Sequence, residues 1–269
     1  MNAEVAEPGA STPSRLLPRR LWHVPSGPGW GPLPELLLML TAVTGLVDAV
    51  SILALGRVFV ANMTGNVVFA GFAIVGAPGF SLAASLFALA GFLVGAWAGG
   101  AMASRIGHDR ALHLRAATAV ELALVAIALV IAAVSGGAGA FHGVTGLTHG
   151  ASPFDAAVTD ALAAVLATAL GVQNAVARKL AVPDLTTTVL TMTLTGIGAD
   201  SRSGHRGRVL LIRRTLAVVT MLGSGALSAW LVLHVGTAIP LAVSTGLLAI
   251  VAGWAAIATR RPSEWRKAA

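Results

Sequence analysis

The chain of 269 residues contains no cysteine and no tyrosine, and it carries little charge. The absence of cysteine excludes disulfides and thiolate metal sites, so thiols give no indication of the redox compartment. Asp, Glu, Lys and Arg together make up 11% of the residues, whereas a soluble domain carries roughly 25% because its surface must be wetted. This chain therefore has too little charge to coat a soluble globule of its size.

Apolar residues and glycine are abundant instead. Hydrophobic types make up 56% of the chain, glycine contributes 31 residues, and the mean hydropathy is +0.81. Several stretches of about 20 residues are almost free of charge, which is the length an α-helix needs to cross the roughly 30 Å hydrocarbon layer. Frequent glycine suits helices that pack closely in lipid. The composition predicts an all-α, polytopic membrane helix bundle of the bacterial inner-membrane type.

Eight apolar segments can be distinguished along the chain. They cover residues 35–55, 58–77, 82–103, 116–134, 156–177, 185–199, 215–234 and 238–258. Segment 58–77 is interrupted by the polar run Asn62-Met63-Thr64-Gly65-Asn66, and segment 185–199 is short and rich in threonine. These two segments are the least suited to cross the membrane as straight helices.

Cytoplasmic loops carry an excess of Lys and Arg, and this rule separates the possible topologies. If all eight segments cross, twelve of these residues lie inside and six outside. If the two unusual segments enter and return on the same side, 17 lie inside and only Arg57 lies outside. A seven-span alternative, with the N-terminus outside, gives 15 and 3. The charges favour six spans plus two broken or re-entrant segments, with the seven-span alternative still open.

The spanning segments are expected to form one transmembrane domain, residues 35–259, between two cytoplasmic tails. Residues 1–34 are rich in Pro, Gly and Ser. They lack the continuous apolar core of a signal peptide, so a flexible tail is expected there. Residues 260–269 form a short basic tail.

The two unusual segments occupy matching places in the two halves of the domain, about residues 35–134 and 156–258. Gly45-Leu46-Val47-Asp48-Ala49-Val50 precedes the first, and Gly171-Val172-Gln173-Asn174-Ala175-Val176 precedes the second. Each half has an odd number of spans, so the second half must be inverted relative to the first. Inverted repeats with interrupted helices indicate secondary transporters, which bind solutes near the midplane between the halves. The alternative is a duplication retained for packing alone.

These runs also resemble a known family. Gly45-Leu46-Val47-Asp48-Ala49 with Phe59-Val60-Ala61-Asn62-Met63-Thr64-Gly65-Asn66, and Gly171-Val172-Gln173-Asn174-Ala175 with the following threonine run, are similar to the signature of the bacterial YoaK-type membrane proteins. That family is defined by a domain of unknown function. The resemblance covers about residues 38–258. It implies a multi-pass bacterial membrane protein and implies no substrate. The family usually has His at the position of Asn62 and Gly at that of Met192.

Asp48 is the strongest candidate for a solute or ion site, because an ionised carboxylate deep in a span is costly and usually faces a cavity or a partner. The alternative is a hydrogen bond that only packs helices. Polar residues of both broken segments are expected to line the same centre, although Asn and Thr also bond across helices in lipid. These candidates are Asn62, Thr64, Gly65, Asn66, Gln173, Asn174, Thr188, Thr191 and Thr193.

Other features are assigned to packing and to the lipid. Gly91, Gly95 and Gly99 form a small-residue ridge that predicts a close helix contact, either within the chain or in a homodimer. The arginine run from Arg202 to Arg214 lies next to a span, so anionic lipid is a better partner for it than nucleic acid. Glu121 is expected to pair with Arg115 or to reach toward the cytoplasm.

The predicted function is a transporter or permease for a small solute or ion, with its site at the two broken segments. A non-transporting scaffold or lipid-binding protein is the first alternative, and an intramembrane enzyme is the second. No enzyme is expected, because the chain has no His-Glu-x-x-His run, no Gly-x-Ser-x-Gly elbow and no Gly-rich kinase loop. No cofactor is expected either. A metal site is not expected, since His142 and His149 share only a Gly-rich loop.

Overall fold

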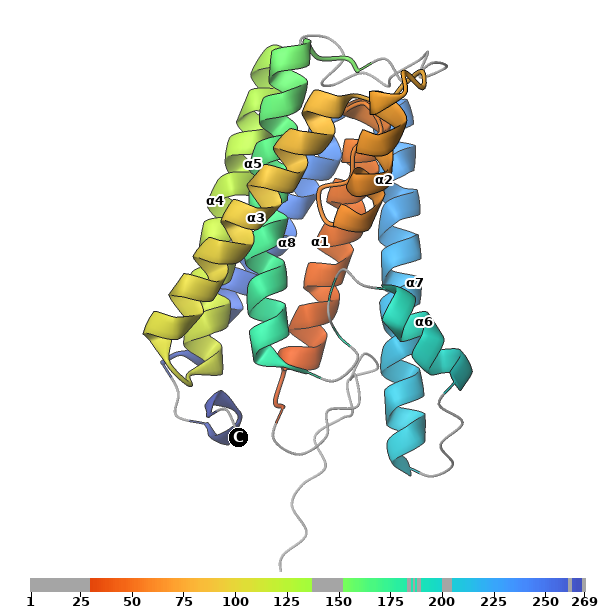
Figure 1. Cartoon of the computed structure of the whole chain (residues 1–269). Helices are drawn as coiled ribbons and strands as arrows, with labels where there is room; N and C mark the ends of the chain where they lie inside the picture. The colour runs from red at the N-terminus through yellow and green to blue at the C-terminus, as the bar shows by residue number, and fades with distance from the viewer. Residues whose placement is uncertain are drawn as a thin grey trace, which may run out of the picture.

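The computed structural model describes residues 30–136, 152–182, 190–199, 205–260 and 263–267, together with Leu185 and Thr187. These residues form helices and no strands (Figure 1). The helices are α1 (Leu33–Ala54), α2 (Met63–Ile74), α3 (Leu82–Ile106), α4 (Arg110–Ser135), α5 (Ala156–Leu180), α6 (Leu190–Ala199), α7 (His205–His234) and α8 (Ala238–Ala258), followed by the short 3₁₀ helix η2 (Glu264–Arg266).

Six of these helices are long and apolar enough to cross a membrane. They are α1, α3, α4, α5, α7 and α8. The other two, α2 and α6, have 12 and 10 residues. At 1.5 Å per residue they are too short for a hydrocarbon layer of roughly 30 Å. The predicted all-helical membrane bundle with six spans and two short segments is therefore confirmed. The residues of the long N-terminal tail up to Gly29 and the loop containing His142 and His149 lie outside the described residues.

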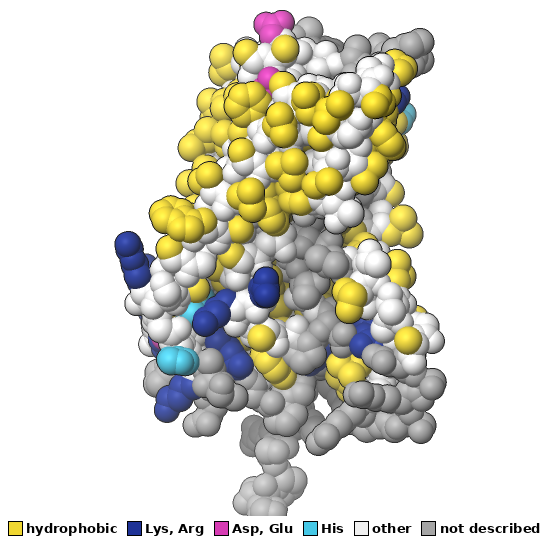
Figure 2. All heavy atoms as spheres, viewed as in Figure 1, with side chains coloured by type: hydrophobic (Ala, Val, Ile, Leu, Met, Phe, Trp, Pro, Cys, Tyr) yellow, Lys and Arg dark blue, Asp and Glu magenta, His cyan; other side chains and the backbone are white. Residues whose placement is uncertain are grey.

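Helices α1 and α5 form the centre of the bundle. The most apolar windows of α1 and α5 are 67% and 56% buried, against 22–33% for the other four spans. Leucines such as Leu37 on α1 and Leu166 on α5 are completely buried. The outer helices instead expose large apolar side chains, among them Leu93 and Trp97, and Figure 2 shows such side chains over the upper and middle part of the visible face. Large apolar side chains are unfavourable on a surface that faces water, but they suit a helix surface that faces lipid.

The tertiary packing follows the inverted repeat. In Figure 1 α1 rises from the end where the C-terminus lies, whereas α5 descends toward that end. Exchanging α1–α4 for α5–α8 maps each packing pair onto another: α3 on α5 becomes α7 on α1, α4 on α5 becomes α8 on α1, and α2 on α3 becomes α6 on α7. The pair formed by α4 and α8 maps onto itself. The two halves are therefore related by a pseudo-two-fold axis that passes between them.

The predicted glycine ridge makes a contact inside the chain. A Cβ added at Gly91 or Gly95 would overlap the backbone of Ala164 or Thr168 on α5, and one added at Gly99 would press on Val172 and Ala175. All three glycines are buried. Of the two alternatives for the ridge, the structure shows the contact within the chain, between α3 and α5.

One expectation for a charged residue is wrong. Glu121 is fully buried, and both of its carboxyl oxygens lack a hydrogen-bond partner within the described part of the chain, so it does not pair with Arg115. In the arginine run, Arg213 and Arg214 are buried whereas Arg208 is exposed, and contact of the run with anionic lipid stays a prediction. The guanidinium of Arg214 donates to the carbonyl oxygen of Gly196 in the last turn of α6, where a cation complements the helix dipole.

Candidate functional site

The connection between α1 and α2 forms a re-entrant hairpin. Residues 55–62 leave the end of α1 and turn back beside it, because the backbone N–H groups of Val60 and Ala61 donate to Asp48 Oδ1 over 3.2 and 3.1 Å. Helix α2 then returns toward the same end of the bundle (Figure 1). The two ends of the hairpin lie side by side, since the Arg57 guanidinium lies 5.7 Å from the centroid of the Phe80 ring.

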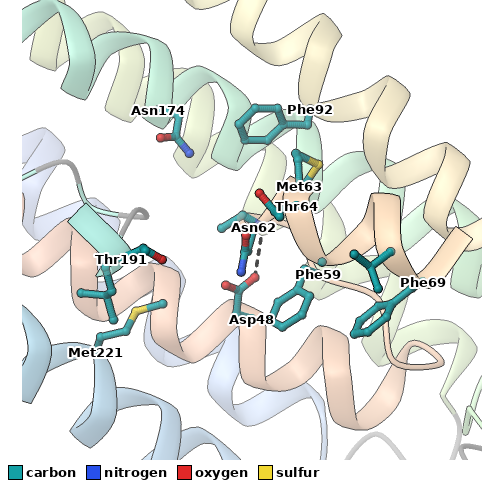
Figure 3. A pocket seen from close by; sticks show the side chains of 14 residues that line it. Asp48, Phe59, Asn62, Met63, Thr64, Phe69, Phe92, Asn174, Thr191 and Met221 are labelled. Atoms are coloured by element: carbon teal, nitrogen blue, oxygen red, sulfur yellow. Dashed lines mark hydrogen bonds between the residues drawn. The ribbon is translucent and has the colours of Figure 1, made fainter. Parts of the chain in front are cut away.

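Asp48 supplies the acceptor that this non-helical backbone needs at membrane depth. The residue lies in the last third of α1, and its relative exposure is 6%. Within the described residues the carboxylate makes no hydrogen bond other than the two at Oδ1. Figure 3 shows this carboxylate directed toward Asn62 and the start of α2, with Asn174 and Thr191 on other sides of the same space. The second oxygen, Oδ2, is therefore left for another donor.

Asn66 holds the hairpin from the opposite side. Its Oδ1 accepts from the Phe59 N–H over 2.8 Å, and its Nδ2 donates to the Phe59 carbonyl over 2.6 Å. The absence of a side chain at Gly65 leaves room for the Phe59 ring, because a Cβ there would lie 2.5 Å from a ring carbon. The Phe59 ring in turn stacks on Phe69, with centroids 5.6 Å apart. The polar run of the first broken segment thus forms a defined turn.

A cavity of about 640 Å³ lies between this turn, α3, α5, α6 and α7. Its described lining contains one carboxylate, two asparagine side chains, two threonines, one glycine, and an apolar wall that includes phenylalanine and methionine. The lining residues are Asp48, Phe59, Ala61, Asn62, Met63, Thr64, Gly65, Val68, Phe69, Phe92, Asn174, Leu190, Thr191 and Met221.

The cavity lies on the pseudo-two-fold axis, because equivalent residues of the two halves line it together. Asp48 on α1 corresponds to Asn174 on α5, and Thr64 at the start of α2 corresponds to Thr191 at the start of α6. Phe92 and Met221 form a further pair. Gly171 on α5 packs against the Phe92 carbonyl, and its counterpart Gly45 on α1 packs against the Met221 carbonyl. Both halves thus line one central site at equivalent positions, and the first half adds further residues of the hairpin to the described lining.

Comparison with known families now identifies the chain. Residues 36–254 match the family described as "Protein of unknown function (DUF1275)". This match spans most of the chain. The protein belongs to the DUF1275 family.

A curated relative agrees with this assignment. Over 60 residues the chain is 47% identical to UPF0700 transmembrane protein YoaK of Bacillus subtilis (strain 168). The aligned region covers 22% of this chain and 27% of that relative. The aligned part is thus about a quarter of the relative's length. No solved structure matches the chain significantly. The resemblance to the YoaK-type proteins is confirmed, and the chain is a multi-pass membrane protein of this family.

The structure separates the predicted site residues of this DUF1275 protein into two groups. Six of them line the cavity: Asp48, Asn62, Thr64, Gly65, Asn174 and Thr191. Three do not belong to its described lining: Asn66, Gln173 and Thr193. Asn66 shapes the hairpin, and Gln173 Nε2 donates over 2.8 Å to Thr44 Oγ1, joining α5 to α1. Thr193 is buried in α6, and Thr188 lies outside the described residues.

The aromatic and methionine wall was missed by reasoning from sequence. Phe59, Phe69 and Phe92 look like ordinary apolar residues of a membrane helix, and no polar signal distinguishes them. The repeat did not indicate them either, because Thr64 and Thr191 are 127 residues apart whereas Phe92 and Met221 are 129 apart, so a direct extension of the repeat misses this pair. The described part of the chain has no cluster of three or more His, Asp or Glu residues that could hold a metal ion.

Proposed function

We propose that this protein is a secondary transporter or permease for a small solute, and that the cavity on the pseudo-two-fold axis is its binding site. The observation that carries the proposal is the pairing of equivalent residues from both halves around one cavity, at the ends of two short helices that enter from opposite sides. Inverted repeats with broken helices place transport sites at this position. A scaffold would need only a packed, apolar midplane.

The same proposal assigns the membrane in which the bundle lies and the side of that membrane on which its termini lie. The bundle lies in the bacterial inner membrane with both termini in the cytoplasm, because Lys and Arg residues concentrate at the end of the bundle where the C-terminus lies (Figure 2). Such an excess is typical of the cytoplasmic side. We also propose that the protein is not an enzyme, since acid–base chemistry needs two suitably placed groups and Asp48 is the one acid among the described residues that line the cavity.

Alternating access can be tested with cysteines, because the natural chain has none. Thr64→Cys and Thr191→Cys place one thiol in each half of the cavity. In oriented vesicles we expect a membrane-impermeant maleimide to label both variants from either side, since transport exposes the site alternately. Leu93→Cys, on the lipid-facing side of α3, serves as the control and stays unlabelled. Labelling of both cavity positions from one side only would rule out alternating access.

A further inference from the structure

The charges around the cavity point to a ligand with two opposite charges. We infer that the cavity binds a zwitterion of the amino-acid type with an apolar, aromatic side chain. This inference rests on the proposed site and assigns its substrate class. Its negative element is Asp48, whose Oδ1 is occupied by two backbone donors while Oδ2 makes no hydrogen bond within the described residues. A ligand ammonium group supplies the donor that Oδ2 lacks.

The positive elements are two helix N-termini. The first residues of α2, Met63 to Gly65, and the first residues of α6, Leu190 and Thr191, line the cavity. The first turn of an α-helix has N–H groups without an intrahelical partner, and no side chain caps the N-terminus of α2. Helix N-termini of this kind bind carboxylates, and broken membrane helices use them for the anionic groups of substrates.

The two kinds of charge are similar in size. A helix N-terminus is equivalent to roughly half a positive charge, so two of them together offset about one carboxylate. None of the described lining residues is Lys, Arg or His, so the helix ends provide the positive potential there. A simple cation would be repelled by both helix N-termini, and a simple anion would be repelled by the Asp48 carboxylate. A zwitterion satisfies both elements at once.

The rest of the wall defines the third part of the ligand. Phe59, Phe69 and Phe92 line the cavity together with Met63 and Met221, and Figure 3 shows them on several sides of it. Aromatic rings and methionine sulfur make favourable contacts with an aromatic side chain. The volume of about 640 Å³ lies within the roughly 300–1,000 Å³ of small-molecule sites.

Equilibrium binding to the purified full chain in detergent tests the inference with three matched probes. L-Phenylalanine carries both charges, 2-phenylethylamine lacks the carboxylate, and 3-phenylpropanoate lacks the ammonium group. We expect saturable binding of phenylalanine, with an affinity at least tenfold higher than that of either truncated probe. Asp48→Asn keeps an Oδ1 acceptor for Val60 and Ala61 but loses the charge. It should lower phenylalanine affinity at least tenfold and leave 3-phenylpropanoate binding equal or stronger.

A matched pair on α2 tests the apolar wall. Phe69→Leu removes a ring that lines the cavity and should weaken phenylalanine binding about threefold to tenfold. Phe72→Leu, on the same helix but outside the described lining, should leave the binding unchanged.

The outcomes separate this inference from the proposed function. Equal or tighter binding of either truncated probe, or no saturable phenylalanine binding, would overturn the zwitterion assignment; labelling of the cavity cysteines from both sides would still support transport. Tight phenylalanine binding that depends on Asp48 supports the assignment even if those cysteines are labelled from one side only, in which case the proposed transport is wrong.

Discussion

At the scale of single residues, glycine determines where helix backbones meet. Gly45 on α1 lies against the backbone of Met221 and Gly225 on α7, and Gly171 on α5 lies against that of Phe92 and Ala96 on α3. The two contacts are equivalent under the exchange of the repeat halves. Close backbone approach in lipid increases van der Waals contact, which replaces the hydrophobic effect as the force that holds membrane helices together.

Gly95 provides a test of this contact, with Gly100 on the same helix as its control. A Cβ at Gly95 would overlap the backbone of Thr168, whereas nothing lies within 4 Å of a Cβ at Gly100. We expect Gly95→Ala to destabilise the protein by about 1–3 kcal/mol through overpacking, and Gly100→Ala to be neutral or stabilising by up to about 1 kcal/mol through helix propensity. Thermal unfolding in detergent measures both. Equal transition temperatures for the two variants would mean that α3 does not approach α5 as closely as described.

At the scale of elements, the end of the chain is tied to the turn between α3 and α4. Asp109 precedes α4 and accepts from the Leu112 N–H over 3.1 Å, and the Arg266 guanidinium of η2 donates to the same carboxylate. Arg266 also donates to the Thr259 carbonyl over 3.1 Å. Partial burial acts to raise the pKa of Asp109, but the hydrogen bonds from Arg266 and from the start of α4 outweigh it, so this pKa lies below its ordinary value of 3.8.

The lowered pKa of Asp109 makes the attachment of η2 sensitive to acid. A group whose pKa falls on folding contributes stability above its unfolded pKa and loses that contribution as the pH falls through the folded value. We therefore expect peptides covering residues 259–267 to stay protected from hydrogen exchange at neutral pH and to lose protection below about pH 4. Asp109→Asn should remove most of this protection already at pH 7. Asp155→Asn, a change at the start of α5 where the side chain makes no capping bond, is the control. Unchanged protection in Asp109→Asn would show that other contacts hold η2.

At the scale of the whole molecule, the bundle is two inverted copies of one unit around a shared cavity. The central helices are the first of each half, and the re-entrant segments follow them on opposite sides. A small change in how one half packs on the other alters the surroundings of the cavity at both ends, which is the physical basis of alternating access in such folds. An even number of spans places the start of α1 and the end of α8 on the same side of the membrane.

Cysteine accessibility distinguishes the six-span topology from the seven-span alternative. The hairpin of α2 puts positions 57 and 77 at the same end of the bundle, whereas a crossing segment would put them on opposite sides. We expect Arg57→Cys and Ala77→Cys to react with an impermeant maleimide added outside the cell, and Ser104→Cys, at the end of α3, to react only after the membrane is opened. Labelling of Ala77→Cys but not Arg57→Cys from outside would support seven spans.

The sequence by itself determined the helical membrane class, favoured six spans over seven, and located both broken segments, the inverted repeat and the candidate Asp48. These features depend on local properties, namely run length, charge placement and the spacing of motifs, which can be read along one dimension. It did not distinguish Asn62, which lines the cavity, from Asn66, whose amide is held by Phe59. Both belong to one polar run, and only the turn of the backbone decides which of them faces the ligand space.

Only the tertiary structure decided what surrounds each residue. The glycine ridge of α3 lies on α5 rather than on a second copy, and Glu121 is enclosed without the partner expected from its neighbours along the chain. The wall of phenylalanine and methionine combines residues of the hairpin and α3 with Met221 of α7, which lies far along the chain. In lipid an apolar side chain is equally acceptable on a helix surface and in a site, so hydropathy cannot tell the two apart, and the packing of the helices has to decide.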